Sequence, residues 1–81
     1  MIDEKEMIEI IRKRVTYFYE NKIKVHVALK TDRWYNGIIT SVSDESFILN
    51  DFKAGEVVVF FIEVYPNGIE EYKEEVKEND N

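Results

Sequence analysis

The sequence predicts a mainly β fold, in which an N-terminal α-helix precedes a five-stranded, strongly bent antiparallel small barrel. Three observations support this prediction. Apolar residues follow a helical spacing over residues 3–20 and alternate with polar residues from residue 23 onward. Tight turns then separate short segments of strand-like composition. Residues 57–62 form an unbroken run of β-branched and aromatic side chains, which is typical of a strand covered on both faces.

The predicted helix runs from Asp3 to Glu20. Asp3 is a favourable N-cap, and Glu6 can complete a capping box with it. Acidic residues precede basic ones along the helix, as the helix dipole favours. We expect Asn21 to end the helix in a left-handed conformation. Apolar residues at spacings of three and four are expected to form one stripe that closes the open end of the barrel: Met7, Ile8, Ile11, Val15, Phe18 and Tyr19.

Five strands are predicted, over residues 23–30, 34–42, 46–51, 57–62 and 69–72. Asn36-Gly37 interrupts the second strand, and a glycine inside a strand often marks a bend. Such a bend allows a small sheet to curl into a barrel. Pro66-Asn67-Gly68 is expected to break the chain before the fifth strand.

The length indicates one domain, which we place at residues 1–72, followed by an acidic tail at residues 73–81 that is expected to be disordered. The formal net charge is -6, and residues 70–81 hold six acidic and two basic side chains. The body of the chain is therefore close to neutral. Nucleic-acid-binding proteins usually carry a basic surplus. A local basic patch stays open as an alternative, because most of the Arg and Lys residues lie within residues 1–33.

The composition also excludes several classes of function. The absence of cysteine excludes disulfides, thiolate metal sites and cysteine nucleophiles. The chain has neither an apolar stretch long enough to span a bilayer nor a hydrophobic signal core, so we expect a cytoplasmic protein without a membrane partner. No catalytic triad, phosphate-binding glycine loop or metal-ligand spacing is visible. We therefore predict no enzyme activity, no cofactor and no metal site.

The apolar run at residues 57–62 predicts self-assembly. One short chain can hardly cover both faces of such a strand and also shield its backbone edge. An unpaired edge this apolar would aggregate. We therefore expect copies of the chain to pair, through an interface that includes Val57, Val58, Val59, Phe60, Phe61 and Ile62.

The segment 25–39 resembles the Sm-like family, which includes the Sm and LSm proteins and bacterial Hfq. In that family, a strand that ends in Leu and then Lys or Asn precedes a short turn, an Arg-containing second strand and a glycine. Here Leu29-Lys30, Arg33 and Gly37 follow that order. The resemblance continues through residues 47–51 and 55–57 and covers roughly residues 3–72.

Membership of this family would imply an RNA-binding homo-oligomeric ring of five to seven subunits. The fourth strand of one subunit would pair with the fifth strand of the next, which adds Ile69 and Tyr72 to the expected interface. The family's RNA motifs are altered, however. Glu45 stands at the base-stacking position and Phe47 at the position of the base-reading asparagine. The region that corresponds to the second motif, residues 65–68, lacks a cation. The family's uridine pocket is therefore not expected.

Two function classes remain open. The first is a ring that binds single-stranded RNA with altered or weakened specificity. Tyr65 could stack on a base and Asn67 could hydrogen-bond one, while Trp34 follows the basic turn of Lys30 and Arg33. Trp34 could equally pack structurally. The second class is a protein-interaction scaffold that keeps the ring but has lost the RNA site.

Overall fold

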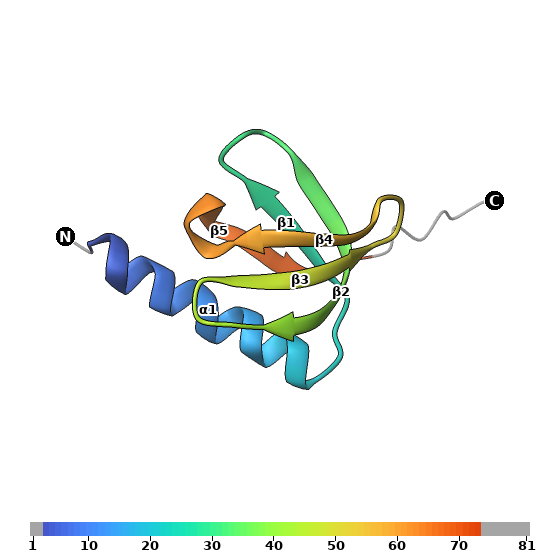
Figure 1. The fold of residues 1–81 in the computed structure, drawn as a ribbon, viewed down its shortest axis with the longest axis horizontal. Helices are drawn as coiled ribbons and strands as arrows, with labels where there is room; N and C mark the ends of the chain where they lie inside the picture. The colour runs from blue at the N-terminus through green and yellow to red at the C-terminus, as the bar shows by residue number, and fades with distance from the viewer. Residues whose placement is uncertain (1–2, 74–81) are drawn as a thin grey trace.

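The computed structural model describes residues 3–73 and confirms the predicted fold class (Figure 1). Five strands form one antiparallel sheet in the order β4-β3-β2-β1-β5. The sheet curls, and helix α1 packs against β2, β5 and the short helix η1. Most of the predicted acidic tail, residues 74–81, lies outside the described residues. The elements are α1 (Glu4–Glu20), β1 (Val25–Leu29), β2 (Trp34–Val42), β3 (Ser46–Asp51), β4 (Gly55–Phe60), η1 (Phe61–Glu63) and β5 (Val64–Glu71).

Helix α1 has the predicted N-cap, Asp3, and ends at the predicted Glu20, but its left-handed residue lies one position later than expected. Asp3 Oδ1 accepts from the Glu6 backbone N–H at 2.9 Å, and the Glu6 side chain accepts from the Asp3 N–H, so the capping box is complete. The prediction that Asn21 is left-handed is wrong. Its φ is -100°, and Lys22 has the positive φ, at 54°. The Ile23 N–H donates to the Phe18 carbonyl, which is the Schellman arrangement and puts the left-handed residue one position after the cap.

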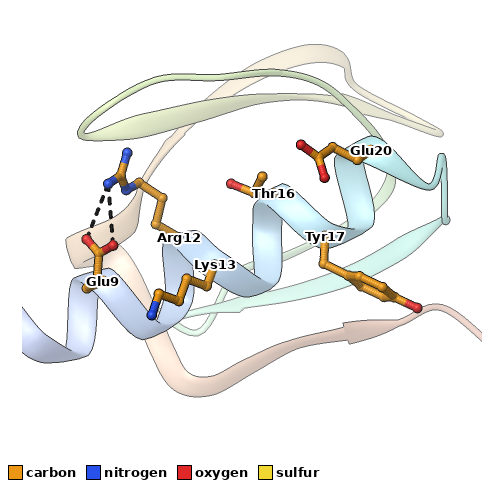
Figure 2. Close-up of a pocket in the computed structure, with 6 residues that line it drawn as sticks. All are labelled: Glu9, Arg12, Lys13, Thr16, Tyr17 and Glu20. Carbon is orange, nitrogen blue, oxygen red and sulfur yellow. Dashed lines mark hydrogen bonds and ion pairs between the residues drawn. The ribbon is translucent and has the colours of Figure 1, made fainter.

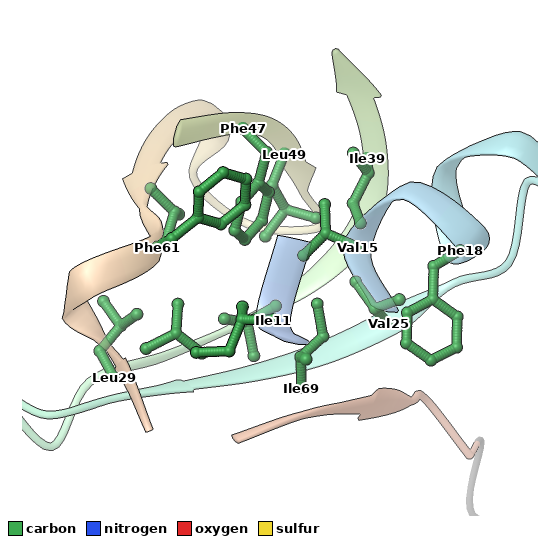
Figure 3. Packing of buried hydrophobic residues seen from close by; sticks show 13 residues of the cluster. Ile11, Val15, Phe18, Val25, Leu29, Ile39, Phe47, Leu49, Phe61 and Ile69 are labelled. Carbon is green, nitrogen blue, oxygen red and sulfur yellow. The ribbon is translucent and has the colours of Figure 1, made fainter. Parts of the chain in front are cut away.

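The core lies between the curled sheet and α1 (Figure 3). Ile11, Val15 and Phe18 are the buried residues of the helix. Tyr19 was expected in the same stripe but is 40% exposed, because the position after Phe18 lies about 100° around the helix. Phe47 of β3 stacks on Phe61 of η1 with ring centroids 5.7 Å apart. This aromatic pair packs β3 against the start of η1.

Strand β2 bends where Gly37 lies between two neighbouring strands. Gly37 pairs with Val25 of β1 on one side and with Asp51 of β3 on the other. A Cβ atom at this position would collide with the backbone carbonyl of Asn50. The β2–β3 register also shifts between Ile39 and Ser41. The expected bend is therefore made by a close backbone approach together with a bulge.

The boundaries predicted for the last two strands are wrong. Strand β4 ends at Phe60, and Phe61 and Ile62 belong to η1. The chain turns there because the Phe61 ring is fully buried in the core and its N–H donates to the Glu45 carbonyl at 3.0 Å. Strand β5 then begins at Val64 and runs through the predicted breaker at residues 66–68.

The breaker is absorbed as a bulge in the pairing between β1 and β5. Leu29 pairs with Val64 and Val27 pairs with Ile69, so β5 has extra residues opposite a short piece of β1. Pro66 lies in this bulge on an edge strand, where its missing N–H does no harm. Residues 66–68 therefore do interrupt the regular pairing, but β5 pairs with β1 on both sides of them.

The sheet has two open edges within the described chain. Strand β4 pairs with β3 alone and β5 pairs with β1 alone. Val59 and Phe61 face the core, while Val58, Phe60 and Ile62 are 56%, 45% and 46% exposed. We call these three residues the apolar row. A single copy therefore covers only one face of the apolar run.

Replacing Gly37 by alanine should destabilise the fold by about 3 kcal/mol or more, because the paired backbones cannot move apart to admit a Cβ. The matched control is Gly55→Ala. Gly55 has a φ of 81° but open space around it, so only backbone strain of about 1–2 kcal/mol is expected. Urea unfolding followed by circular dichroism compares the two variants. Equal unfolding midpoints would contradict the proposed crowding at Gly37.

Candidate nucleic-acid interface

The structure places the five predicted RNA-binding residues on two sides of β1, and all five are exposed. Lys30 and Arg33 lie in the β1–β2 turn, and Trp34 is the first residue of β2. Tyr65 and Asn67 lie in the bulge of β5. Strand β1 separates β2 from β5, so Trp34 and the bulge flank it on opposite sides. The Lys30 N–H donates to the Glu63 carbonyl at 2.8 Å, which joins the turn to the start of β5.

The family-like motif positions do not form a base-binding pocket. Phe47, at the expected base-reading position, is completely buried. The true connection between β4 and β5 is η1, so residues 65–68 are not that connection, and η1 carries no cation. The nearby cleft is acidic and apolar, and its lining residues are Ile8, Asp44, Glu45, Phe60 and Ile62.

Both arginines of the basic cluster at residues 12–14 make contacts within the chain. Arg12 lies 3.3 Å from Glu9 and 3.6 Å from Asp44, and the Arg14 guanidinium donates to the Ile69 carbonyl at 2.9 Å. Figure 2 shows a shallow hollow along α1, with the Arg12–Glu9 pair at one end and Glu20 at the other. Opposite charges alternate along this face, so it does not form an open basic surface for phosphates.

A second hollow gathers aromatic, amide and cationic side chains from three separate elements. It has a volume of about 420 Å³ and lies where the beginning of β2, the β3–β4 hairpin and the end of β5 meet. We call it the aromatic cleft. Its lining residues are Trp34, Asn36, Asp51, Phe52, Lys53 and Tyr72.

The aromatic rings of this cleft are both accessible and mutually arranged. Trp34 is 62% exposed and Phe52 is 52% exposed. Phe52 and Tyr72 make an edge-to-face contact, with centroids 5.5 Å apart and ring planes at 77°. The Lys24 ammonium lies 5.8 Å from the Phe52 ring centre. Exposed rings beside cations are what single-stranded nucleic acids use for stacking and phosphate contact.

Asp51 holds the hairpin that presents Phe52 and Lys53. Its carboxylate accepts the backbone N–H groups of Asn36, Lys53 and Ala54 at 2.7–2.9 Å. Burial raises the pKa of Asp51, but these donors and the Lys53 charge outweigh it, so the pKa lies below its ordinary value. The carboxylate is thus anionic near neutral pH, with its charge directed at three backbone donors.

His26 fixes the Asn36 amide at the wall of the cleft. His26 Nδ1 lies 2.5 Å from Asn36 Oδ1. A carbonyl oxygen can only accept, so Nδ1 of His26 carries the hydrogen and the amide NH₂ of Asn36 is left to donate elsewhere. The Phe52 N–H also donates to the Asn36 backbone carbonyl at 2.8 Å, so Asn36 and the hairpin keep a fixed relation.

Sequence reasoning identified Trp34 but missed its companions. Lys24, Asn36, Phe52 and Lys53 were not predicted as binding residues, and Tyr72 was predicted as an interface residue. One available signal was Phe52, because an aromatic side chain in a short polar hairpin loop has little core to enter. Another was strand alternation, which puts Asn36 on the same face as Trp34.

The fold and this cleft define a small curled β-sheet protein with an exposed aromatic and cationic surface. No family model, curated protein or solved structure matched the chain. Within residues 3–73, no group of three or more His, Cys, Asp or Glu residues is placed to hold a metal ion. Over the same residues, no helix combines the length and the apolar character needed to cross a membrane.

Replacing Asp51 by asparagine should lower the free energy of unfolding at pH 7 by about 1–2 kcal/mol, because three backbone N–H groups lose their charged acceptor. A lowered folded-state pKa stabilises the protein above the unfolded pKa of about 4, and that contribution is lost as the pH falls through the folded value. The difference between wild type and variant should therefore shrink at pH 3.

Urea titrations at pH 7 and pH 3 measure this difference. Asp44→Asn is the control, because Asp44 is almost fully exposed and its ion pair with Arg12, at 3.6 Å, lies at the surface. A difference between wild type and Asp51→Asn that does not change with pH would contradict the stabilising role of the Asp51 charge.

Proposed function

We propose that the chain assembles into a closed Sm-like ring of identical subunits and that the ring binds single-stranded RNA. The observation that carries this proposal is the pair of open sheet edges, with the apolar row Val58, Phe60 and Ile62 exposed along and just beyond β4. The RNA component is supported by the aromatic cleft and by the resemblance of residues 25–39 to the Sm-like family.

The geometry of the edges favours pairing between copies. Strand β4 offers backbone N–H and C=O groups on one edge of the sheet, and β5 offers them on the opposite edge. A contact between two different edges is heterologous, and such contacts build either rings or filaments. A bent sheet turns each subunit relative to the last, which favours closure. The family resemblance suggests five to seven copies.

Pairing between copies would also shield the apolar row from water. An exposed apolar strand edge is a template for aggregation. Burying Val58, Phe60 and Ile62 against a neighbour would stabilise the assembly by roughly 25 cal/mol for each Å² of apolar surface removed from water. Tyr65 on the outer part of β5 is 42% exposed and could supply part of the opposing surface.

Replacing Phe60 by lysine should abolish assembly but preserve the subunit fold, because Phe60 is 45% exposed in one copy and a charge there would be buried only in the ring. Native mass spectrometry and light scattering measure the mass, and circular dichroism measures the fold. Val59→Lys should instead unfold the subunit, since Val59 faces the core.

The matched control for assembly is Tyr17→Lys, which places the same charge on an exposed aromatic position of α1. Its mass should equal that of the wild type. A wild-type protein that is monomeric at high concentration, or a Phe60→Lys variant with the full wild-type mass, would refute edge pairing.

RNA binding should depend only modestly on salt for each cleft that is occupied. The described cations near the cleft are few, chiefly Lys24 and Lys53, with Lys30 and Arg33 in the adjoining turn. Each phosphate contact on a single strand contributes a slope of about -0.7 in log K against log salt. Stacking, which is less sensitive to salt, should supply most of the affinity. Fluorescence anisotropy with labelled oligo-U, oligo-A and mixed-sequence RNA at several salt concentrations measures both quantities.

The second candidate is a protein-interaction scaffold that keeps the ring without an RNA site. The acidic and apolar lining around Asp44 and Glu45, at the family's first motif, favours this candidate. The absence of detectable RNA binding at low salt, together with an intact oligomer, would select the scaffold over the RNA-binding ring.

A further inference from the structure

We propose that the aromatic cleft is a subsite for one unpaired guanine base of single-stranded RNA. The base would stack on Trp34, with its acceptor edge facing the donors of Asn36 and Lys53. This inference rests on the RNA component of the proposed function and specifies where and how a base is read.

The indole of Trp34 is available for stacking because its neighbours leave it open. Trp34 pairs across the sheet with Ala28, whose methyl group is too short to cover an indole ring. At 62% exposure, Trp34 is the most exposed of the large hydrophobic side chains in the described chain. Phe52 and Tyr72, held edge to face, line the same cleft and limit its width. The volume of about 420 Å³ falls within the roughly 300–1,000 Å³ of small-ligand sites.

The hydrogen-bonding groups of the cleft favour a base edge made of acceptors. The Asn36 carbonyl oxygen already accepts from His26, which leaves the NH₂ donors as the groups of this amide that are most open to a base. The Lys53 ammonium is also purely a donor. The Asp51 oxygens already accept three backbone N–H groups. Guanine presents two adjacent acceptors, O6 and N7, on one edge. Adenine presents an N6 amino donor beside N7, which would meet the Asn36 donor unfavourably.

The charges around the cleft favour an anionic ligand over a cationic one, because Lys24 and Lys53 outnumber Asp51, whose carboxylate is directed at three backbone N–H groups. The cation–π position on Phe52 is already occupied by Lys24, 5.8 Å from the ring centre. A second cation would be repelled there by Lys24 and by Lys53. An RNA strand brings flat bases for the rings and phosphates for the two lysines. The cleft therefore complements a nucleotide better than a basic peptide.

The protein has a built-in reporter, because Trp34 is its only tryptophan. A base stacked on the indole should quench its fluorescence. The probes are unlabelled, uridine-rich RNA 12-mers that carry guanosine, adenosine or 7-deazaguanosine at two positions. The guanosine RNA should quench Trp34 and bind about fivefold or more tightly than the adenosine RNA. The 7-deazaguanosine RNA, which lacks N7, should lose most of this advantage.

Two substitutions test the roles of the side chains. Phe52→Leu keeps an apolar side chain in the exposed loop but removes the ring, and it should weaken guanosine RNA binding about fivefold or more. Asn36→Asp keeps an oxygen for His26 and turns the remaining donor into an acceptor, so the ratio of guanosine to adenosine affinity should fall below one. Tyr17→Leu, at an exposed ring on α1, is the control and should leave binding unchanged.

The outcomes separate this inference from the proposed function. If the wild-type protein binds none of the RNAs, both the subsite and the RNA component of the proposed function are refuted. If it binds RNA but Trp34 fluorescence does not change, guanosine RNA binds no more tightly than adenosine RNA, and Phe52→Leu binds like the wild type, the subsite alone is refuted. RNA would then be held elsewhere on the protein. The deazaguanosine comparison needs no variant, so the test holds even if Asn36→Asp fails to fold.

Discussion

The stacking of Phe61 on Phe47 is the contact on which the rest of the architecture depends. With its ring in the core and its N–H bonded to the Glu45 carbonyl, Phe61 cannot continue β4 as a straight strand. The chain turns through η1, and β5 crosses to pair with β1 rather than with β4. The sheet therefore curls around its core but keeps two open edges. The same turn sets Ile62 outside the core, so the apolar run gives one buried set of side chains and one exposed row.

Local sequence signals predicted the elements whose boundaries are set locally. The capping box at Asp3 predicted the helix start to within one residue, and the turns that flank β2 and β3 predicted both of these strands at their observed bounds. The last two strands were misplaced because their boundaries depend on distant contacts. Phe61 and Val59 are both apolar residues of strand-like type in the same run. Only the contact of Phe61 with Phe47, which is distant in sequence, shows that the strand ends before Phe61. The turn signal at residues 66–68 was overridden by pairing with β1, which tolerates it as a bulge.

The aromatic cleft illustrates the same limit for binding sites. Trp34 was identified from its position after a basic turn, which is a local pattern. Its companions come from the β3–β4 hairpin and the end of β5, so no window of sequence contains them together. His26 contacts the Asn36 amide through Nδ1, and no local sequence pattern predicted this pairing. Its role could be derived only once β1 and β2 were in register, because that register sets the two side chains opposite each other.

Assembly would affect binding through the number of clefts that one RNA strand can reach, although the apolar row itself has no residue in common with the lining of the aromatic cleft. One stacked base on a subunit of net charge -6 gives a weak contact, and the acidic C-terminal segment adds no attraction for phosphates. A ring repeats the cleft once in every subunit, so one strand of RNA that reaches several clefts converts later contacts into intramolecular ones. The affinity can then rise by orders of magnitude without any new contact in the subunit. On this physical ground an acidic chain with a modest site is a reasonable RNA binder only as an oligomer, and a variant confined to the monomer should lose RNA affinity although its cleft is intact.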